Sequence, residues 1–198
     1  GCGLGNLTRH LTDRELVVAM DISANSVAHV RSRYADCPHV HAAVSDIVSD
    51  TCLELAQYEL DTAISVNVFE HIQDDELALE HTWRLLGPGG TLLLVVPAHG
   101  WLYGSMDRAI GHFRRYSKRS LAVKLEQAQF ELLSQKYINA LAALGWFVNG
   151  RVLKSQVPPQ GQLKLMNPLV PLVQRVESLI SPPFGISLFA VARRLEGS

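Results

Sequence analysis

Two histidines occupy positions at which a proton could be taken from a reacting group. His71 follows Glu70 shortly after an apolar run at 61–66, and His99 follows a strongly apolar run at 91–96. An imidazole has an ordinary pKa near neutrality, so it can accept the proton of a hydroxyl group at physiological pH. We take His71 first and His99 second as candidate catalytic residues. Local packing or hydrogen bonding is the alternative role for each ring.

The stretch 99–116 is dense in aromatic and basic side chains. Five Lys or Arg residues and no acid lie between 108 and 119, and guanidinium groups bind carboxylate or phosphate by planar, two-point contacts. A connection this long without regular structure is typically functional. We therefore expect it to cover a substrate pocket, with Arg114 or Arg115 binding an anionic group of the substrate. A solvated loop, or pairing of Arg with the acidic run 74–76, is the alternative. The candidate substrate-binding residues are Glu70, Tyr103, His112, Arg114, Arg115 and Tyr116.

Three glycines open the chain. Gly1, Gly3 and Gly5 stand directly before a predicted short helix at 6–11. Glycines let the backbone approach a ligand closely, and a helix N-terminus offers free amide groups. A tight turn is the alternative explanation of the glycines by themselves.

Two acids end the first two apolar runs of the chain. Asp21 follows the first run, where a carboxylate can accept hydrogen bonds from two ribose hydroxyls. Asp46 follows the second run, at 39–44, where a carboxylate can accept a hydrogen bond from an adenine amino group. A turn or helix N-cap acid is the alternative for Asp46. Together with the glycines, the two acids predict a nucleotide-like ligand at one edge of a sheet.

These candidates lie on alternating apolar runs and amphipathic segments, which predict an α/β fold with a mostly parallel sheet covered by helices on both faces. Ser23 and Ser117 are expected helix N-caps, and the run 87–90, GPGG, is expected to end the helix before it. The predicted strands are 16–20, 39–44, 61–66, 91–96, 130–138 and 186–192. The predicted helices are 6–11, 23–34, 51–58, 74–86 and one that begins after Ser117.

The region 139–181 is predicted to be a helical insert before the last strand, because its prolines break it into short pieces. Its first part is uncharged from 137 to 150 and too short to span a membrane. A helical cap on the sheet, or a dimer face, is one interpretation. The other interpretation is a lid over a lipid-like substrate, or a contact with a membrane surface.

Composition narrows the class of protein. The 198 residues are 47% hydrophobic and 19% charged, with a net charge of -1, which excludes a disordered chain, a collagen-like fibre and a disulfide scaffold. The near-neutral balance disfavours a general nucleic-acid binder. A chain of this length buries roughly 70% of its unfolded surface, which favours a single domain. The three cysteines form no CxxC motif, so we expect a reduced, cytoplasmic setting and predict no metal site.

At these motifs the chain resembles the class I S-adenosylmethionine (SAM)-dependent methyltransferases. The resemblance runs from Gly1 to Arg194 and rests on GCGLG, the acids of VVAMDIS and AAVSDI, NVFEHI after a strand, and LLGPGGTLLLVVP. The stretch LYGSMDRAIGHFRRYS resembles a bacterial subgroup of uncertain substrate. The resemblance implies SAM as cofactor and a doubly wound, Rossmann-like, seven-stranded sheet of order 3-2-1-4-5-7-6, with strand 7 antiparallel.

The resemblance also implies roles for single residues. The three glycines would cradle the methionine and ribose end of SAM, and Asp21 would bind the ribose diol. The adenine would contact Ile22 and Ile47, with Asp46 at its edge. Asn67, just past the strand at 61–66, would line the methionine side. The cofactor-binding candidates are thus Gly1, Gly3, Gly5, Asp21, Ile22, Asp46, Ile47 and Asn67.

One departure from the family concerns the start of the chain. The family has a strand before the glycines, with an acid two residues before the first of them, and neither is present in 1–198. We therefore expect a single methyltransferase domain that is N-terminally truncated and lacks its first, central strand. Such a chain is expected to be poorly stable, and about 30–50 upstream residues, by usual domain sizes, would complete it.

The expected activity is transfer of a methyl group from SAM to a small-molecule acceptor (EC 2.1.1.-). O-methylation of an anionic, lipid-like or sugar-linked substrate is the expected form. The expected location is cytoplasmic, with a peripheral membrane contact left open, and the oligomeric state is not predicted. Two alternatives remain: a methyltransferase-like binding module without activity, and an NAD(P)-dependent oxidoreductase. The glycine spacing differs from the G-x-G-x-x-G of the latter class.

Overall fold

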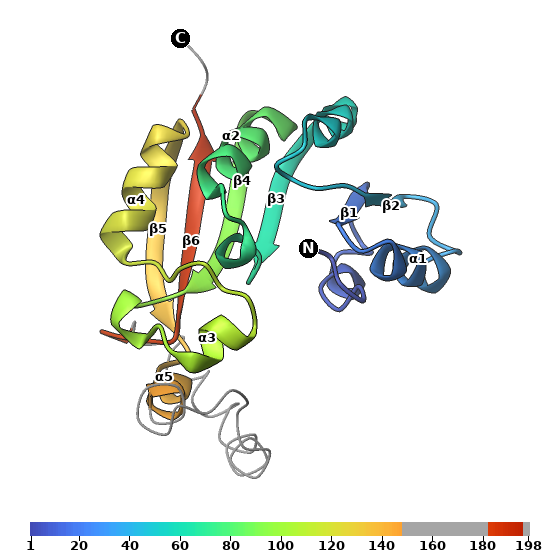
Figure 1. Cartoon of the computed structure of the whole chain (residues 1–198). Helices are drawn as coiled ribbons and strands as arrows, with labels where there is room; N and C mark the ends of the chain where they lie inside the picture. The colour runs from blue at the N-terminus through green and yellow to red at the C-terminus, as the bar shows by residue number, and fades with distance from the viewer. Residues whose placement is uncertain (148–181, 196–198) are drawn as a thin grey trace. The chain divides into compact units, whose positions relative to one another are not determined.

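The computed structural model describes residues 1–147 and 182–195, and its contacts divide the chain into two compact units (Figure 1). The first unit is Gly1–Tyr58 and the second is Glu59–Ser198. The single domain expected for 1–198 stays a prediction.

The first unit contains a parallel pair of strands. Strand β1 (Val17–Asp21) pairs with β2 (Val40–Val44), and helix α1 (Ala24–Arg33) connects them. Ser23 caps α1 by accepting a hydrogen bond from the amide of Ser26 at 3.2 Å, which confirms the predicted N-cap. Two 3₁₀ helices, η1 (Thr8–His10) and η2 (Asp50–Tyr58), occupy the positions predicted as short helices. The β-α-β connection places the carboxyl end of β1 next to the opening glycines.

The second unit is built on a four-stranded sheet of order β3-β4-β6-β5 (Figure 1). Strands β3 (Leu60–Val66) and β4 (Leu86–Pro97) are parallel, and β6 (Ser187–Arg194) runs antiparallel to both β4 and β5 (Phe130–Ile138). Helix α2 (Asp75–Leu85) contacts β4, and helix α4 (Lys118–Gln127) contacts β5 and α2. Burial alternates along β4, with Leu92, Leu94 and Val96 fully enclosed, so one face of the sheet carries the densest core.

The strand pairings agree with two parts of the expected order. Strands β1 and β2 correspond to strands 2 and 3 of the family. Strands 4 to 7 of the family correspond to β3, β4, β5 and β6, in that order. The neighbours 3-2 and 4-5-7-6 and the antiparallel strand 7 are observed. The continuous seven-stranded order stays a prediction.

Two expectations about local structure were wrong. Helix α2 ends at Leu85, as expected from the run 87–90, but strand β4 begins at Leu86 and includes this run, whereas the strand was expected to begin at residue 91; its register with β3 shifts between Leu60 and Thr62. A side chain at Gly90 would lie 2.8 Å from the Gly87 carbonyl oxygen, which explains why glycine suits this close backbone approach. The stretch 99–116 is also not irregular, because it contains η4 (Gly100–Leu102) and helix α3 (Ser105–Ala109).

The predicted insert is described only in part. Its first segment forms helix α5 (Ala140–Phe147), as expected for a short apolar helix, whereas 148–181 lies outside the described residues. Within 1–147 and 182–195, no helix is long and apolar enough to cross a membrane.

Candidate functional site

In the first unit, the glycine loop is joined to the end of β1 by hydrogen bonds. The Cys2 amide donates to the Met20 carbonyl at 2.8 Å, and the Gly3 amide donates to Oδ2 of Asp21 at 2.8 Å. The other carboxylate oxygen, Oδ1, accepts from the Ser23 amide at 2.9 Å. Asp21 therefore orients both the loop and the start of α1 while it remains at the end of the strand.

The environment of Asp21 favours its ionised form. Burial by itself raises the pKa of Asp21, but the amide hydrogen bonds from Ser23 and Gly3 outweigh burial and hold the pKa below its ordinary value. Each carboxylate oxygen has a second lone pair besides the one that an amide uses. Asp21 is thus a charged acceptor at neutral pH that can still bind ribose hydroxyls.

Gly3 and Gly5 both have positive φ angles, of 51° and 75°, but their surroundings differ. Among the described residues other than its two chain neighbours, a side chain at Gly3 would meet no atom within 4 Å, so open space adjoins the loop there. A side chain at Gly5 would lie 3.0 Å from Cε2 of Tyr34, whose hydroxyl donates to the Gly5 carbonyl at 2.9 Å. Gly3 leaves room for a ligand, whereas Gly5 permits the packing of the loop on α1.

The apolar and acidic partners expected for adenine lie on the loops after β1 and β2. Ile22 is 73% exposed directly after Asp21, so an unusually accessible apolar side chain adjoins the ribose acceptor. Asp46 is exposed, and its Oδ1 accepts from the Val48 amide at 3.1 Å, which is the turn role considered as the alternative. Ile47 is half-buried in the same turn. The first unit therefore offers a set of groups that fits a nucleoside.

In the second unit, the connection after β3 carries two of the predicted residues. Asn67 is exposed at the end of the strand with φ 53°, and its backbone amide donates to the Val95 carbonyl at 2.9 Å. The chain then forms a single 3₁₀ turn, η3 (Phe69–His71), which buries Glu70 and leaves His71 exposed. Within this turn, the carboxylate of Glu70 is buried, whereas the imidazole of the adjacent His71 is accessible.

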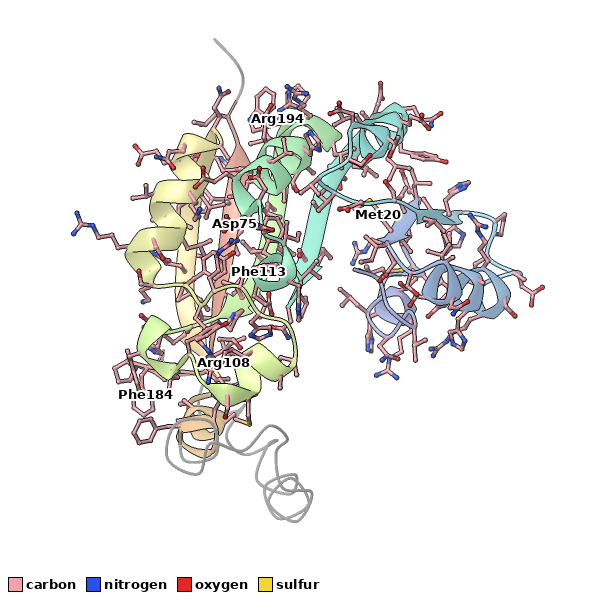
Figure 2. The ribbon with its side chains drawn as sticks, viewed as in Figure 1. Met20, Asp75, Arg108, Phe113, Phe184 and Arg194 are labelled. Atoms are coloured by element: carbon pink, nitrogen blue, oxygen red, sulfur yellow. The ribbon has the colours of Figure 1, made fainter. Side chains whose placement is uncertain are left out.

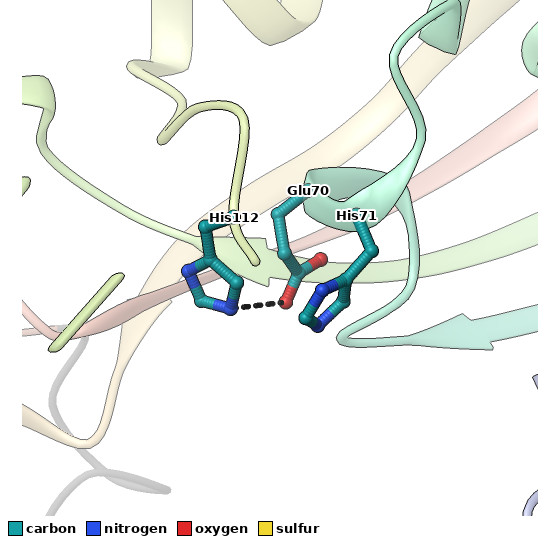
Figure 3. A group of neighbouring side chains, drawn as sticks. All are labelled: Glu70, His71 and His112. Atoms are coloured by element: carbon teal, nitrogen blue, oxygen red, sulfur yellow. Dashed lines mark ion pairs between the residues drawn. The ribbon is translucent and has the colours of Figure 1, made fainter. Parts of the chain in front are cut away.

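Glu70, His71 and His112 converge, and we call them the EHH cluster (Figure 3). One ligand atom from each lies within 4.8 Å of the other two. His112 Nε2 is 3.7 Å from Glu70 Oε1, and the two imidazole rings meet edge to face at 4.7 Å. The cluster brings His71, predicted as a base, together with Glu70 and His112, predicted as substrate-binding residues.

Burial shifts the pKa values of two side chains in the EHH cluster, Glu70 and His71. Burial raises the pKa of Glu70, against the opposing effects of His112 and Arg115. Burial, and then the nearby His112, lower the pKa of His71, although the Gly111 backbone opposes them. His71 is therefore neutral at pH 7 and has a lone pair available for a proton or another electrophile.

Asp107 and Arg115 form a buried ion pair behind the EHH cluster. Asp107 has no exposed side-chain surface, and its Oδ1 accepts from Arg115 Nε at 2.7 Å and lies 2.9 Å from His112 Nδ1. Burial raises the pKa of Asp107, but His112 and Arg115 overcome this and lower it to about 2. The indole of Trp146 on α5 donates to Oδ2 at 3.2 Å. Asp107 and Trp146 were not among the sequence-based candidates, because nothing in their spacing marks them.

Both arginines that were expected to bind an anion make ion pairs within the protein, and only Arg114 pairs with the acidic run 74–76 that was the alternative. Arg114 lies 3.1 Å from Asp75 and donates to the Ile72 and Gln73 carbonyls at 2.7 and 2.6 Å. Asp75 is labelled among the side chains drawn in Figure 2. Arg115 is buried, donating to Asp107 and to the Ala98 carbonyl. Tyr116, also buried, donates to Asp75 at 2.7 Å. These side chains hold the 99–116 segment on η3 and α2.

The other two candidates of this segment also make internal contacts. The hydroxyl of Tyr103 donates to the His112 carbonyl at 2.8 Å. His99 has φ 62°, and its ring stacks on Tyr137 at 4.6 Å. Burial and the nearby Arg115 lower the pKa of His99. Among the described residues, buried Nε2 of His99 meets no hydrogen-bond partner, so its ring is packed rather than presented at the surface.

Comparison with known proteins bears on both units. The sequence model of a methyltransferase domain family matches residues 1–92. A probable S-adenosylmethionine-dependent methyltransferase of Mycolicibacterium smegmatis is 28% identical over 163 residues, which are 79% of this chain and 61% of that protein. The chain thus spans about three-fifths of the length of this relative.

Solved structures support the same fold. The N-methyltransferase NodS from Bradyrhizobium japonicum WM9, in complex with S-adenosyl-L-homocysteine, has a TM-score of 0.62 at 16% identity and covers 99% of this chain and 76% of NodS. The [4+2]-cyclase SpnF has a TM-score of 0.64 at 20% identity, over 100% of this chain and 74% of SpnF. Likeness at these identities shows a Rossmann-like methyltransferase fold with a mixed sheet. The family model over residues 1–92, the relatives and the structural neighbours together support a class I SAM-dependent methyltransferase with S-adenosylmethionine as its cofactor.

Proposed function

We propose that the protein transfers a methyl group from SAM to a hydroxyl oxygen of a small-molecule acceptor. The observation that carries the proposal is the contact between Gly3 and Asp21, which holds an ionised carboxylate beside open space at the end of β1. SAM supplies a methyl group activated by its positively charged sulfur. The residues of this chain bind the cofactor, orient the acceptor and receive the proton that the acceptor loses.

In this proposal Asp21 accepts hydrogen bonds from the ribose diol, and Ile22 contacts the adenine. Gly3 provides the close backbone approach, since nothing lies within 4 Å of the position of a side chain there. Asp46 and Ile47 contact the adenine from the turn after β2. Asn67 belongs to the second unit, and its role beside the methionine part stays a prediction. Gly1 and Gly5 complete the loop, Gly5 through its packing on Tyr34.

A hydroxyl acceptor is proposed because the EHH cluster can take up its proton. A neutral hydroxyl is a weak nucleophile, and a positioned base typically accelerates such a reaction by about 10²–10⁴-fold. His71 is exposed, and its lowered pKa keeps it neutral at pH 7. It is therefore the first candidate base. His99, whose ring is stacked on Tyr137, is the second.

The acceptor is proposed to carry an apolar portion. Ile110 and Phe113 flank the Gly111-His112 pair and are 48% and 52% exposed. Trp101 is 58% exposed, and its ring lies 5.9 Å from that of Phe147. Large exposed apolar side chains beside a polar cluster are typical of a ligand-binding surface. Arg114 and Arg115 are engaged by Asp75 and Asp107, so recognition of an anionic group is not assigned to them.

Calorimetry of SAM binding tests the proposal. The wild-type chain should bind SAM at one site, and Asp21→Asn should weaken binding by at least 10-fold, because a charge-assisted hydrogen bond is worth about 1.5–3 kcal/mol. Asp13→Asn is the matched control, since Asp13 is a 71% exposed acid of the same unit. Equal SAM affinity in Asp21→Asn and wild type would remove Asp21 from the site.

A second experiment identifies the acceptor. The protein is incubated with SAM and a fractionated metabolite extract, and mass spectrometry follows the gain of one methyl group. A product whose methyl lies on oxygen supports the proposal, and a methyl on nitrogen or carbon contradicts the hydroxyl assignment. SAM binding without any product over a broad extract would instead favour a binding module with the fold of a methyltransferase.

A further inference from the structure

We propose that the EHH cluster binds a divalent transition-metal ion through Glu70, His71 and His112. One carboxylate and two imidazoles reach within 4.8 Å of one another from two segments, η3 and the connection after α3. Two imidazoles and a carboxylate on one side of an ion form a known ligand set for divalent iron and related metals, and leave coordination positions open.

The spacing of the cluster suits a bridging ion better than a direct bond. His112 Nε2 and Glu70 Oε1 are 3.7 Å apart, which is too long for a hydrogen bond. Two ligand atoms that each lie about 2.0–2.2 Å from one metal are separated by about 3–4 Å. His71 is exposed, so its side chain can rotate to close the remaining gap without disturbing the core.

His112 is already oriented as a ligand. Its Nδ1 lies 2.9 Å from Oδ1 of the fully buried Asp107. When Nδ1 donates its proton to this carboxylate, the lone pair of Nε2 is directed to the side of Glu70 (Figure 3). A carboxylate behind the imidazole is the usual support of a metal-bound histidine, since it fixes the tautomer and raises the basicity of the ligand nitrogen.

Besides the geometry of the three ligand atoms, the burial of Glu70 independently points to a cation. Its side chain is 1% exposed, and among the described residues its Oε2 has no hydrogen-bond partner. Burying a carboxylate oxygen without a partner is costly. A cation held by the cluster would give this buried oxygen a partner.

The ligand types indicate the class of metal. Imidazole suits zinc, iron, cobalt and nickel, whereas magnesium and calcium prefer oxygen ligands alone. Three protein ligands with an open position are typical of a site that also binds a substrate oxygen. The proposal therefore commits to a borderline transition metal rather than to magnesium.

The inference rests on the proposed function in one respect, the hydroxyl acceptor. A hydroxyl that occupies an open position on the ion would lose its proton to solvent more readily, because the metal lowers the pKa of a bound hydroxyl group. His71 would then be a ligand instead of a base. Binding of the metal itself does not depend on SAM.

Titration with Co²⁺ alone tests the site, read by visible absorption and calorimetry on the full chain without SAM. The wild type should bind one Co²⁺ per chain. His71→Ala and Glu70→Gln should each weaken binding by at least 10-fold. Asp107→Asn, which leaves all three ligands in place, should weaken it by about 10–100-fold. His29→Ala is the control, since His29 is an exposed histidine of α1 outside the cluster.

Each outcome has one meaning. A folded wild type that gives no Co²⁺ absorption overturns the proposal, and so does unchanged affinity in both His71→Ala and Glu70→Gln. His71 is exposed, so His71→Ala should fold as the wild type does, which far-ultraviolet circular dichroism checks. SAM affinity is measured separately on the same samples. Co²⁺ binding without SAM binding would refute the proposed function alone, and SAM binding without Co²⁺ binding would refute the metal site alone.

Discussion

Asp107 lies 2.9 Å from His112, and this hydrogen bond joins a fully buried carboxylate to the imidazole that faces Glu70. The same carboxylate oxygen accepts from Arg115 at 2.7 Å, and Trp146 and Gly104 donate to the other one. One acid of α3 thus connects Arg115, α5 and the EHH cluster. The first prediction concerns its contribution to stability.

Asp107→Asn should lower the free energy of unfolding by about 3–5 kcal/mol, because it leaves the buried Arg115 without a counter-charge. Urea unfolding followed by circular dichroism measures the change. Glu80→Gln is the control, since Glu80 forms an exposed ion pair with Arg84 and should cost at most about 1 kcal/mol. Equal midpoints for the two variants would mean that Asp107 does not hold this segment.

Substitutions at the two loop glycines should affect different properties, namely SAM binding at Gly3 and stability at Gly5. Gly5→Ala should destabilise the protein by about 1–3 kcal/mol, since its methyl group would lie 3.0 Å from Tyr34. Gly3→Ala meets open space, so only the cost of a positive φ, about 1 kcal/mol, applies to stability. Its methyl group would instead occupy the space proposed for SAM.

Thermal unfolding and SAM calorimetry together check this pair. We expect Gly5→Ala to lower the melting temperature more than Gly3→Ala does, and Gly3→Ala to lose at least 10-fold in SAM affinity. Retention of full affinity in Gly3→Ala would show that the ligand does not approach the backbone at Gly3.

Asp21 should make stability depend on pH at the acidic end. Its pKa in the folded protein is lower than the ordinary value, so its ionised form contributes stability that is fully present above the unfolded pKa of about 4. This contribution is lost as the pH falls through the lower pKa of the folded state. In Asp21→Asn the corresponding part of the pH dependence should disappear.

Urea unfolding of wild type and Asp21→Asn at pH 6, 4 and 3 measures the effect. The difference in unfolding free energy between the two proteins should shrink as the pH falls. A difference that stays constant from pH 6 to 3 would show that the amide hydrogen bonds from Gly3 and Ser23 do not depend on the charge of Asp21.

Chelation should distinguish the two roles considered for His71. If His71 is a metal ligand, EDTA should abolish methyl transfer by the wild type, and Co²⁺ should restore it. If His71 is a general base without metal, EDTA should have no effect, while His71→Ala should lower kcat by about 10²–10⁴-fold. The measurement is turnover of the identified acceptor at saturating SAM, with SAM affinity recorded to show that the cofactor site is intact.

Much of the fold followed from local pattern. The segments 16–20, 39–44 and 130–138 became strands with ends shifted by at most one residue. The first is a short apolar run, which is typical of a buried strand. Ser23 and Ser117 became N-caps for a local reason, since a serine hydroxyl satisfies the first free amides of a helix. The run 87–90 ends α2 as predicted, but the start of the next strand was placed too late, because pairing with β3 decides whether a glycine segment extends a strand.

The residue types of the site were readable from the sequence, but their partners were not. Asp21, Glu70 and His71 stand at strand ends and turns, where polar side chains of parallel sheets gather. The structure decided that Arg114 and Arg115 pair with Asp75 and Asp107, which lie 39 and 8 residues away and on different helices. It also brought His112 to Glu70 across 42 residues. Charge, spacing and periodicity specify what each segment can do, whereas only the packing of distant segments decides which opposite charges are buried together and which lone pairs remain available.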